Sequence, residues 1–130
     1  MSKRLAWAVV IGSILCFAQA GGASFTAKSD LQSTYKSVLN AIKSEGLAVE
    51  AASADAGIKT KQVVTGHYRQ TGTHLEIQFI QQAGGSTEVM VTVYDEKRYK
   101  ALQTEPWSTP KLNMDKSAAE SLRLKAALGL

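Results

Sequence analysis

The sequence predicts an α+β fold, a single antiparallel sheet with two helices packed on one face, preceded by an N-terminal signal peptide. Three observations carry the globular part of this prediction. Residues 29–46 have the apolar spacing of an amphipathic helix, residues 59–95 alternate between apolar and polar positions between turn residues, and residues 116–128 favour a second helix. Hairpins pair antiparallel, and two amphipathic helices need an apolar surface to cover, so one sheet with both helices on the same face satisfies both requirements.

Residues 1–20 have the three-part layout of a secretory signal peptide. Lys3 and Arg4 form a short positive region, residues 5–17 form a mostly apolar run, and Ala18-Gln19-Ala20 is a small-x-small cleavage pattern. The apolar run is shorter than the ~20 residues that a transmembrane helix needs, and no second apolar run follows it. We therefore expect a mature chain without a transmembrane span, located in the periplasm or secreted.

Cys16, the only cysteine, lies inside this leader. Bacterial lipoproteins carry Gly, Ala or Ser directly before the modified cysteine, whereas Leu15 stands there in this chain, which argues against a lipid anchor at Cys16. Lipidation of Cys16 and retention of an uncleaved leader are the two alternatives to cleavage after Ala20. Cleavage leaves residues 21–130 as a single small α+β domain without disulfide or thiol chemistry.

The first helix is the clearest element, and it follows a short strand predicted at residues 23–28. Ser29 is the expected N-cap, with Gln32 as its capping-box partner, and Gly46 is the expected end of the helix. Apolar residues recur at helical spacing and make one stripe: Leu31, Tyr35, Val38, Leu39 and Ile42.

The middle of the chain predicts a sheet. A strand at residues 47–53 precedes a hairpin formed by residues 59–68 and 73–80, with its turn near Thr71-Gly72, and a further strand covers residues 88–95. Alternation gives the sheet a core face with Val64, Tyr68, Leu75, Ile77, Phe79, Val89, Val91 and Val93. The opposite, mostly polar face holds Thr65, His67, Arg69, His74, Glu76, Gln78, Met90, Thr92 and Tyr94.

The last part of the chain predicts an irregular stretch and then a helix. Trp107 lies in the irregular stretch, where it either caps the small core, the interpretation we favour, or anchors a partner. Asp115 is the expected cap of the helix, whose modest apolar side comprises Ala119, Leu122, Ala126 and Leu128. The residues that we expect to contact a partner are Trp107, Tyr94, Met90 and Arg69.

The sequence contains no clear catalytic or cofactor signature. No Gly-x-Ser-x-Gly motif occurs, and no cysteine follows the leader, so we expect neither an enzyme nor a cofactor. His67 and His74 fall on one face of the predicted hairpin, where Glu76 offers a third ligand for Zn²⁺ or Cu²⁺. Two solvent-exposed histidines that titrate freely are the simpler interpretation, so the expected metal site is none.

The charge pattern does not favour nucleic-acid binding. The formal net charge is +4, but two of the 15 basic residues lie in the leader, and the rest nearly balance 11 acidic residues. The densest basic group, at positions 97–100, directly follows two acidic residues. That arrangement is typical of a solvated strand end rather than a nucleic-acid surface.

Four short motifs add a family resemblance. They are the strand end Phe25-Thr26-Ala27, Tyr35 in the helix, the turn Asp55-Ala56-Gly57-Ile58 and the strand Thr87-Glu88-Val89-Met90-Val91. Together they resemble small exported bacterial proteins and lipoproteins of unknown function that have a β-α-β-β-β-α domain. The resemblance covers most of residues 23–128 and implies the fold and a location in the cell envelope, but it carries over no active-site residue.

These observations predict a non-enzymatic accessory or protein-interaction module of the bacterial cell envelope. Its partner would be another envelope protein or a second copy of the chain, met through the open sheet face or a strand edge. The alternative is a small-ligand-binding protein with a pocket between the sheet and the helices. A filled interface between these layers would count against that alternative.

Overall fold

The computed structural model describes residues 22–100 and 103–130. The predicted leader, with Cys16, lies outside these residues. No helix in the described part is long and apolar enough to cross a membrane. The elements are β1 (Ala23–Ala27), α2 (Leu31–Ser44), β2 (Val49–Ser53), β3 (Gly57–Thr60), β4 (Val63–Thr65), β5 (Arg69–Gln81), β6 (Thr87–Tyr99), β7 (Lys111–Leu112) and α3 (Met114–Ala127).

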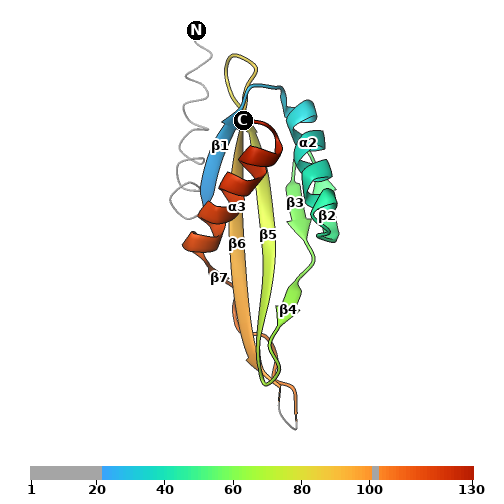
Figure 1. Ribbon diagram of the computed structural model, residues 1–130, viewed down its shortest axis with the longest axis vertical. Helices are drawn as coiled ribbons and strands as arrows, with labels where there is room; N and C mark the ends of the chain where they lie inside the picture. Colours follow the sequence, from blue (N-terminus) through green and yellow to red (C-terminus); the bar gives the residue numbers. More distant parts are fainter. Residues whose placement is uncertain (1–21, 101–102) are drawn as a thin grey trace.

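The described residues form one antiparallel sheet in the order β1-β6-β5-β3-β2, with two helices on one face, which confirms the predicted fold class. β5 and β6 pair over thirteen residues each, from Arg69↔Tyr99 to Gln81↔Thr87. In the half of this ladder that ends at the Arg69↔Tyr99 pair, β4 pairs with β5 and β7 pairs with β6. Figure 1 shows both helices beside the upper part of the sheet, while the β5–β6 ladder continues below them.

This layout divides the molecule into two parts. We call residues 61–74, 94–100 and 103–112 the arm, and the other described residues the body. The body contains α2, α3 and the strands they cover, and the arm contains β4, β7 and the outer ends of β5 and β6. Residues 103–110, which we call the returning segment, run back along β6. Hydrogen bonds from Glu105 N to Tyr99 O (3.1 Å) and from Ser108 N to Lys97 O (2.9 Å) hold this segment to the strand.

The core lies between the sheet and the helices of the body. Side chains of a strand alternate between faces, so the odd-numbered residues of β5 and β6 point to the helices. These include Leu75, Ile77, Phe79, Val89, Val91 and Val93, all buried as predicted, and they pack with Val38 and Ile42 of α2 and Leu124 of α3. The predicted α2 stripe is confirmed, because its remaining members, Leu31, Tyr35 and Leu39, pack against the same cluster.

Two predicted core residues are exposed instead. Val64 retains 44% of its accessible surface and Tyr68 retains 74%. Both belong to the arm, which extends beyond the helices and therefore has no apolar layer to pack against. Val64 pairs with Gly72 and therefore lies on the face of the even-numbered residues of β5, opposite the helices, because the true turn lies earlier than the predicted one. Tyr68 lies outside the strands, in the bend before β5.

The predicted turn at Thr71-Gly72 is wrong. β5 runs through both residues, and the chain turns earlier, at Gly66, whose φ of +93° suits glycine. Gly72 serves a close approach instead, because a Cβ at this position would collide with the side chain of Gln62. The single strand expected at residues 59–68 is accordingly two strands, β3 and β4.

The helix ends also differ from the predictions. The N-cap of α2 is Asp30, whose Oδ1 accepts a hydrogen bond from Ser33 N (2.8 Å), rather than Ser29. The N-cap of α3 is Asn113, whose Oδ1 accepts from Lys116 N (2.9 Å), rather than Asp115. Gly46 follows the end of α2 with a φ of +84°, as predicted.

α3 turns a different side to the core than the one that we predicted, except at its end. The helix buries Ser117, Ser121 and Leu124, and it leaves Leu122 66% exposed. Ala119 and Ala126, which were expected on the buried side with Leu122, are exposed as well. Leu128, the fourth residue of that predicted side, packs against the core as expected.

Gly57 provides a test of the body. Its φ is +96°, and a Cβ there would collide with the carbonyl oxygen of Ile77, whereas Gly84, at φ +90°, faces open space. We expect Gly57→Ala to lower the free energy of unfolding by roughly 3 kcal/mol and Gly84→Ala by roughly 1 kcal/mol, since both strain the backbone but only one also meets a neighbouring strand. Urea denaturation of both variants measures the difference, and equal losses would contradict the close β3–β5 packing.

Candidate functional site

The arm is held together by polar and aromatic side-chain pairs across its strands. On the face that continues the core, Thr73 Oγ1 donates to Asp95 Oδ1 (2.7 Å), and the guanidinium of Arg69 lies 5.7 Å from the ring centre of Tyr99. On the other face, Arg98 Nε donates to Gln70 Oε1 (2.8 Å). Such cross-strand pairs each contribute roughly 0.2–1 kcal/mol, so the arm forms without a buried apolar layer.

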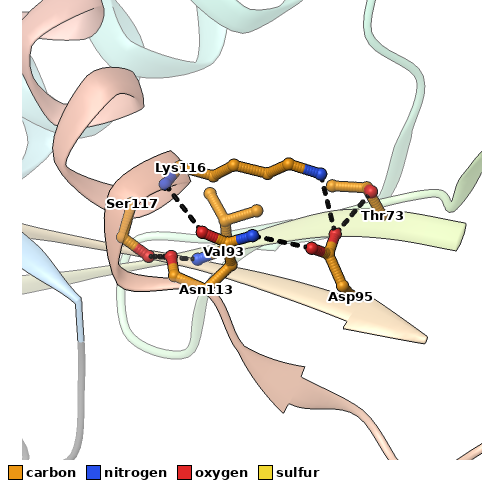
Figure 2. Close-up of polar contacts among 6 residues, drawn as sticks. All are labelled: Thr73, Val93, Asp95, Asn113, Lys116 and Ser117. Carbon is orange, nitrogen blue, oxygen red and sulfur yellow. Dashed lines mark hydrogen bonds and ion pairs between the residues drawn. The ribbon is translucent and has the colours of Figure 1, made fainter. Parts of the chain in front are cut away.

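Asp95 lies where the arm meets the body. Figure 2 shows its carboxylate accepting hydrogen bonds from Thr73 on β5 and from Asn113 and Lys116 at the start of α3. The Asn113 Nδ2–Oδ2 distance is 2.8 Å and the Lys116 Nζ–Oδ1 distance is 3.1 Å. One carboxylate thus ties together two strands and a helix.

The same network explains why Ser117 of α3 is buried. Ser117 Oγ donates to the carbonyl of Asn113 (2.7 Å) and accepts the backbone N–H of Val93 (2.9 Å), as Figure 2 shows. Asn113 N in turn donates to the carbonyl of Val93 (2.9 Å). A buried N–H without a partner is unfavourable, so a serine is more suitable here than an apolar residue.

The hydrogen bonds to Asp95 favour the charged form of its carboxylate. Burial alone would raise the pKa of its carboxyl, but the hydrogen bonds from Thr73, Asn113 and Lys116, with the positive charge of Lys116, lower that pKa overall. A carboxylate with a lowered pKa that already accepts three hydrogen bonds is a weak general base.

Basic and aromatic side chains gather on the arm. Arg98 stacks over Trp107, with 4.1 Å between the guanidinium carbon and the ring centre, and Arg69 lies over Tyr99. A surface cleft of about 540 Å³ is lined by both arginines, Lys97, Tyr99 and residues of the returning segment that include Glu105 and Pro106. Tyr68 and Tyr99 expose 74% and 51% of their surfaces.

The acidic groups of the arm are partly engaged in internal contacts. Asp95 is paired with Lys116, and Glu96 accepts a hydrogen bond from Gln62 Nε2 (2.7 Å). Glu105 lines the cleft as its acidic member. Three basic residues, Arg69, Lys97 and Arg98, and one acidic residue, Glu105, therefore line the cleft, which gives its lining a net positive charge.

Three of the four predicted interaction residues, Arg69, Tyr94 and Trp107, lie in the arm, whereas Met90 lies in the body. Arg69 and Trp107 each take part in a cation–π pair. Tyr94 is half-buried and stacks on His74, with 5.3 Å between ring centres. Burial, and to a smaller extent the nearby negative charge of Glu76, raises the pKa of the Tyr94 hydroxyl. Met90 exposes only 4% of its surface, which leaves little of it for a partner.

The three weak metal candidates do not form a common site. His67 is exposed in the turn before β5, whereas His74 is buried on β5, where its Nε2 lies 2.9 Å from Oε2 of Glu76. Across residues 22–100 and 103–130, no three His, Cys, Asp or Glu side chains are grouped closely enough to hold a metal ion.

Comparison with known proteins leaves the resemblance to exported proteins a prediction. No protein-family model matches the sequence, and no curated protein matches it.

Sequence reasoning missed Arg98, Tyr99, Asp95 and Asn113 as parts of a site. The alternation of β6 continues four residues past Asp95, into a run of charged residues that was interpreted as a solvated strand end. The cross-strand partners of those residues, Thr73, Gln70 and Arg69, are more than twenty positions away in the chain, so no local pattern signals the pairs.

Amide hydrogen exchange tests the division into body and arm. We expect amides at residues 69–73 and 95–99 to exchange faster than those at residues 75–79 and 89–93 of the same strands, because only the latter cover a buried apolar core. Mass spectrometry of peptides from exchanged samples measures this contrast. Uniform protection along β5 and β6 would contradict it.

Asp95 predicts a pH dependence of stability. We expect Asp95→Ala to lower the free energy of unfolding by roughly 2–4 kcal/mol, since hydrogen bonds to a charged group are lost. Because folding lowers the pKa of Asp95, its stabilisation is complete above the unfolded-state value of about 3.9 and is lost as the pH falls through the folded-state pKa. Urea titrations from neutral to acidic pH measure it, with the exposed turn residue Asp55→Ala as the control. Parallel pH curves for the wild type and Asp95→Ala would contradict the assignment.

Proposed function

We propose that this protein is a non-enzymatic interaction module of the bacterial cell envelope, exported to the periplasm or beyond, and that the arm is its contact surface. The observation that carries the proposal is the arm itself. A polar extension beyond the body adds no residue to the buried hydrophobic core, yet it positions two arginines on aromatic rings, one on each face, with an exposed cleft beside them.

The polar clusters of the described residues favour a binding role over catalysis. Asp95 is saturated by three hydrogen bonds, and His74 is held between Glu76 and Tyr94. Neither cluster contains a nucleophile next to a free general base, which is the arrangement that acyl-transfer enzymes use.

The packing of the body favours the interaction module over a small-ligand protein. Val38 and Ile42 of α2 are fully buried, and the ring of Tyr35 meets Phe79 edge-on, with 5.7 Å between centres. The interface between α2 and the sheet is therefore filled at the positions where a ligand of the alternative function would lie.

Site-specific photo-crosslinking in the producing bacterium tests the proposal. We expect a photoreactive residue at Tyr68, exposed at the end of the arm, to give adducts with a partner, because the arm is the proposed contact surface. A matched photoreactive residue at Lys36, exposed on α2, serves as the control and should give none. Mass spectrometry identifies adducts of protein or lipid alike. Adducts from Lys36 and none from Tyr68 would contradict the assignment of the arm.

A further inference from the structure

The geometry points to an anionic lipid surface as the partner of the arm, with the guanidinium groups of Arg69 and Arg98 bound to phosphate groups of the lipid heads. This inference rests on the proposed function, because it names the class of partner that the arm would meet. It also goes beyond that function, since a contact surface as such could equally be made for a protein.

The two arginines lie on opposite faces of the arm, in the last two residue pairs of the β5–β6 ladder, and each side chain is already oriented by its neighbours. Arg98 is fixed by the ring of Trp107 on its face and by Gln70 on its Nε–H. A guanidinium carries five N–H donors, so four remain on its terminal nitrogens, in the planar arrangement that matches two phosphate oxygens. Arg69 lies over Tyr99 at a longer distance, with 5.7 Å between the guanidinium carbon and the ring centre. Ordering these side chains before binding reduces the entropy lost when the phosphate is bound.

The surroundings of the arginines are typical of a membrane interface. Lys97 lines the same cleft, and Lys100 is exposed and bonded through its backbone N–H to the carbonyl of Tyr68 (2.7 Å). Tyr68 and Tyr99 present exposed amphipathic rings at the end of the arm, where Arg69↔Tyr99 is the last pair of the ladder. Tyrosine is enriched at the level of lipid headgroups, and basic residues near an anionic leaflet each add attraction.

A protein partner fits the arm less well. The centres of protein interfaces are depleted of charged residues, whereas charged residues line the cleft of the arm. Basic and aromatic side chains also bind nucleic acids. The predicted leader, however, directs the chain to the cell envelope, where lipid headgroups carry phosphate groups. Both classes are therefore outcomes of the test.

Vesicle sedimentation with the full chain tests the inference. The probes are vesicles of phosphatidylcholine alone and vesicles that also contain phosphatidylglycerol. The arm variant is Arg69→Gln with Arg98→Gln, and the control is Lys36→Gln with Lys43→Gln, which removes the same charge from exposed positions of α2. All forms keep the leader, so any insertion of its apolar run contributes equally to every measurement.

We expect the arm variant to bind the anionic vesicles roughly 10- to 30-fold more weakly than the control, with equal binding of both to neutral vesicles. Raising the salt concentration should reduce this difference, because screening weakens charge attraction. If the arm variant fails to fold, Lys97→Gln with Lys100→Gln keeps both arginine stacks and should weaken binding in the same direction.

Equal binding of the arm and control variants to anionic vesicles would overturn the inference. Tighter arm-dependent binding to a single-stranded oligonucleotide or to polyglutamate than to the vesicles would overturn it as well. These outcomes are separable from the proposed function. A protein adduct from Tyr68 without arm-dependent vesicle binding would contradict the lipid partner but support the interaction module. The absence of both results would contradict both proposals.

Discussion

The pairing of β5 with β6 is the constraint on which the rest of the molecule depends. One register runs through all thirteen residue pairs, so the same alternation that directs Leu75 and Val93 to the core also directs Thr73 and Asp95 to the next position of that face. A slip by one residue would turn the whole set to the opposite face and would remove the core and the arm contacts at once.

At the junction between body and arm, the interactions that hold β5 to β6 on the core face change from buried apolar contacts to side-chain hydrogen bonds. Leu75 and Val93 are the last buried apolar pair, and the next pair outward on that face, Thr73 and Asp95, is joined by a hydrogen bond. α3 begins at this junction, so its first turn meets polar groups rather than an apolar surface. This is the physical reason why the first turn of the helix buries Ser117, a polar residue, against β6.

The candidate site was only partly predictable from the sequence. Arg69 and Trp107 were identified as candidates, but as members of an open sheet face and an irregular loop. The register of β5 and β6 brings Arg69 to Tyr99, and the returning segment brings Trp107 to Arg98. The nearly balanced total charge concealed this grouping, because Asp95 is paired with Lys116 of α3 while three basic residues and a single acidic one line the cleft.

The sequence by itself determined the elements whose cause is local. The stripe of α2, its end before Gly46 and the alternation of residues 75–79 and 89–93 follow from side-chain spacing and backbone preference alone. The tertiary structure decided the outcome where a local sequence pattern was compatible with two structures. Gly72 became a close-approach site because Gln62 packs over it, and Asn113 rather than Asp115 became the cap of α3 and also reaches Asp95. Val64 stayed exposed because its pairing with Gly72 turns it to the face that the helices do not cover, and Tyr68 stayed exposed because it lies in the bend before β5. Each of these outcomes depends on contacts between residues distant in the chain, which no local pattern encodes.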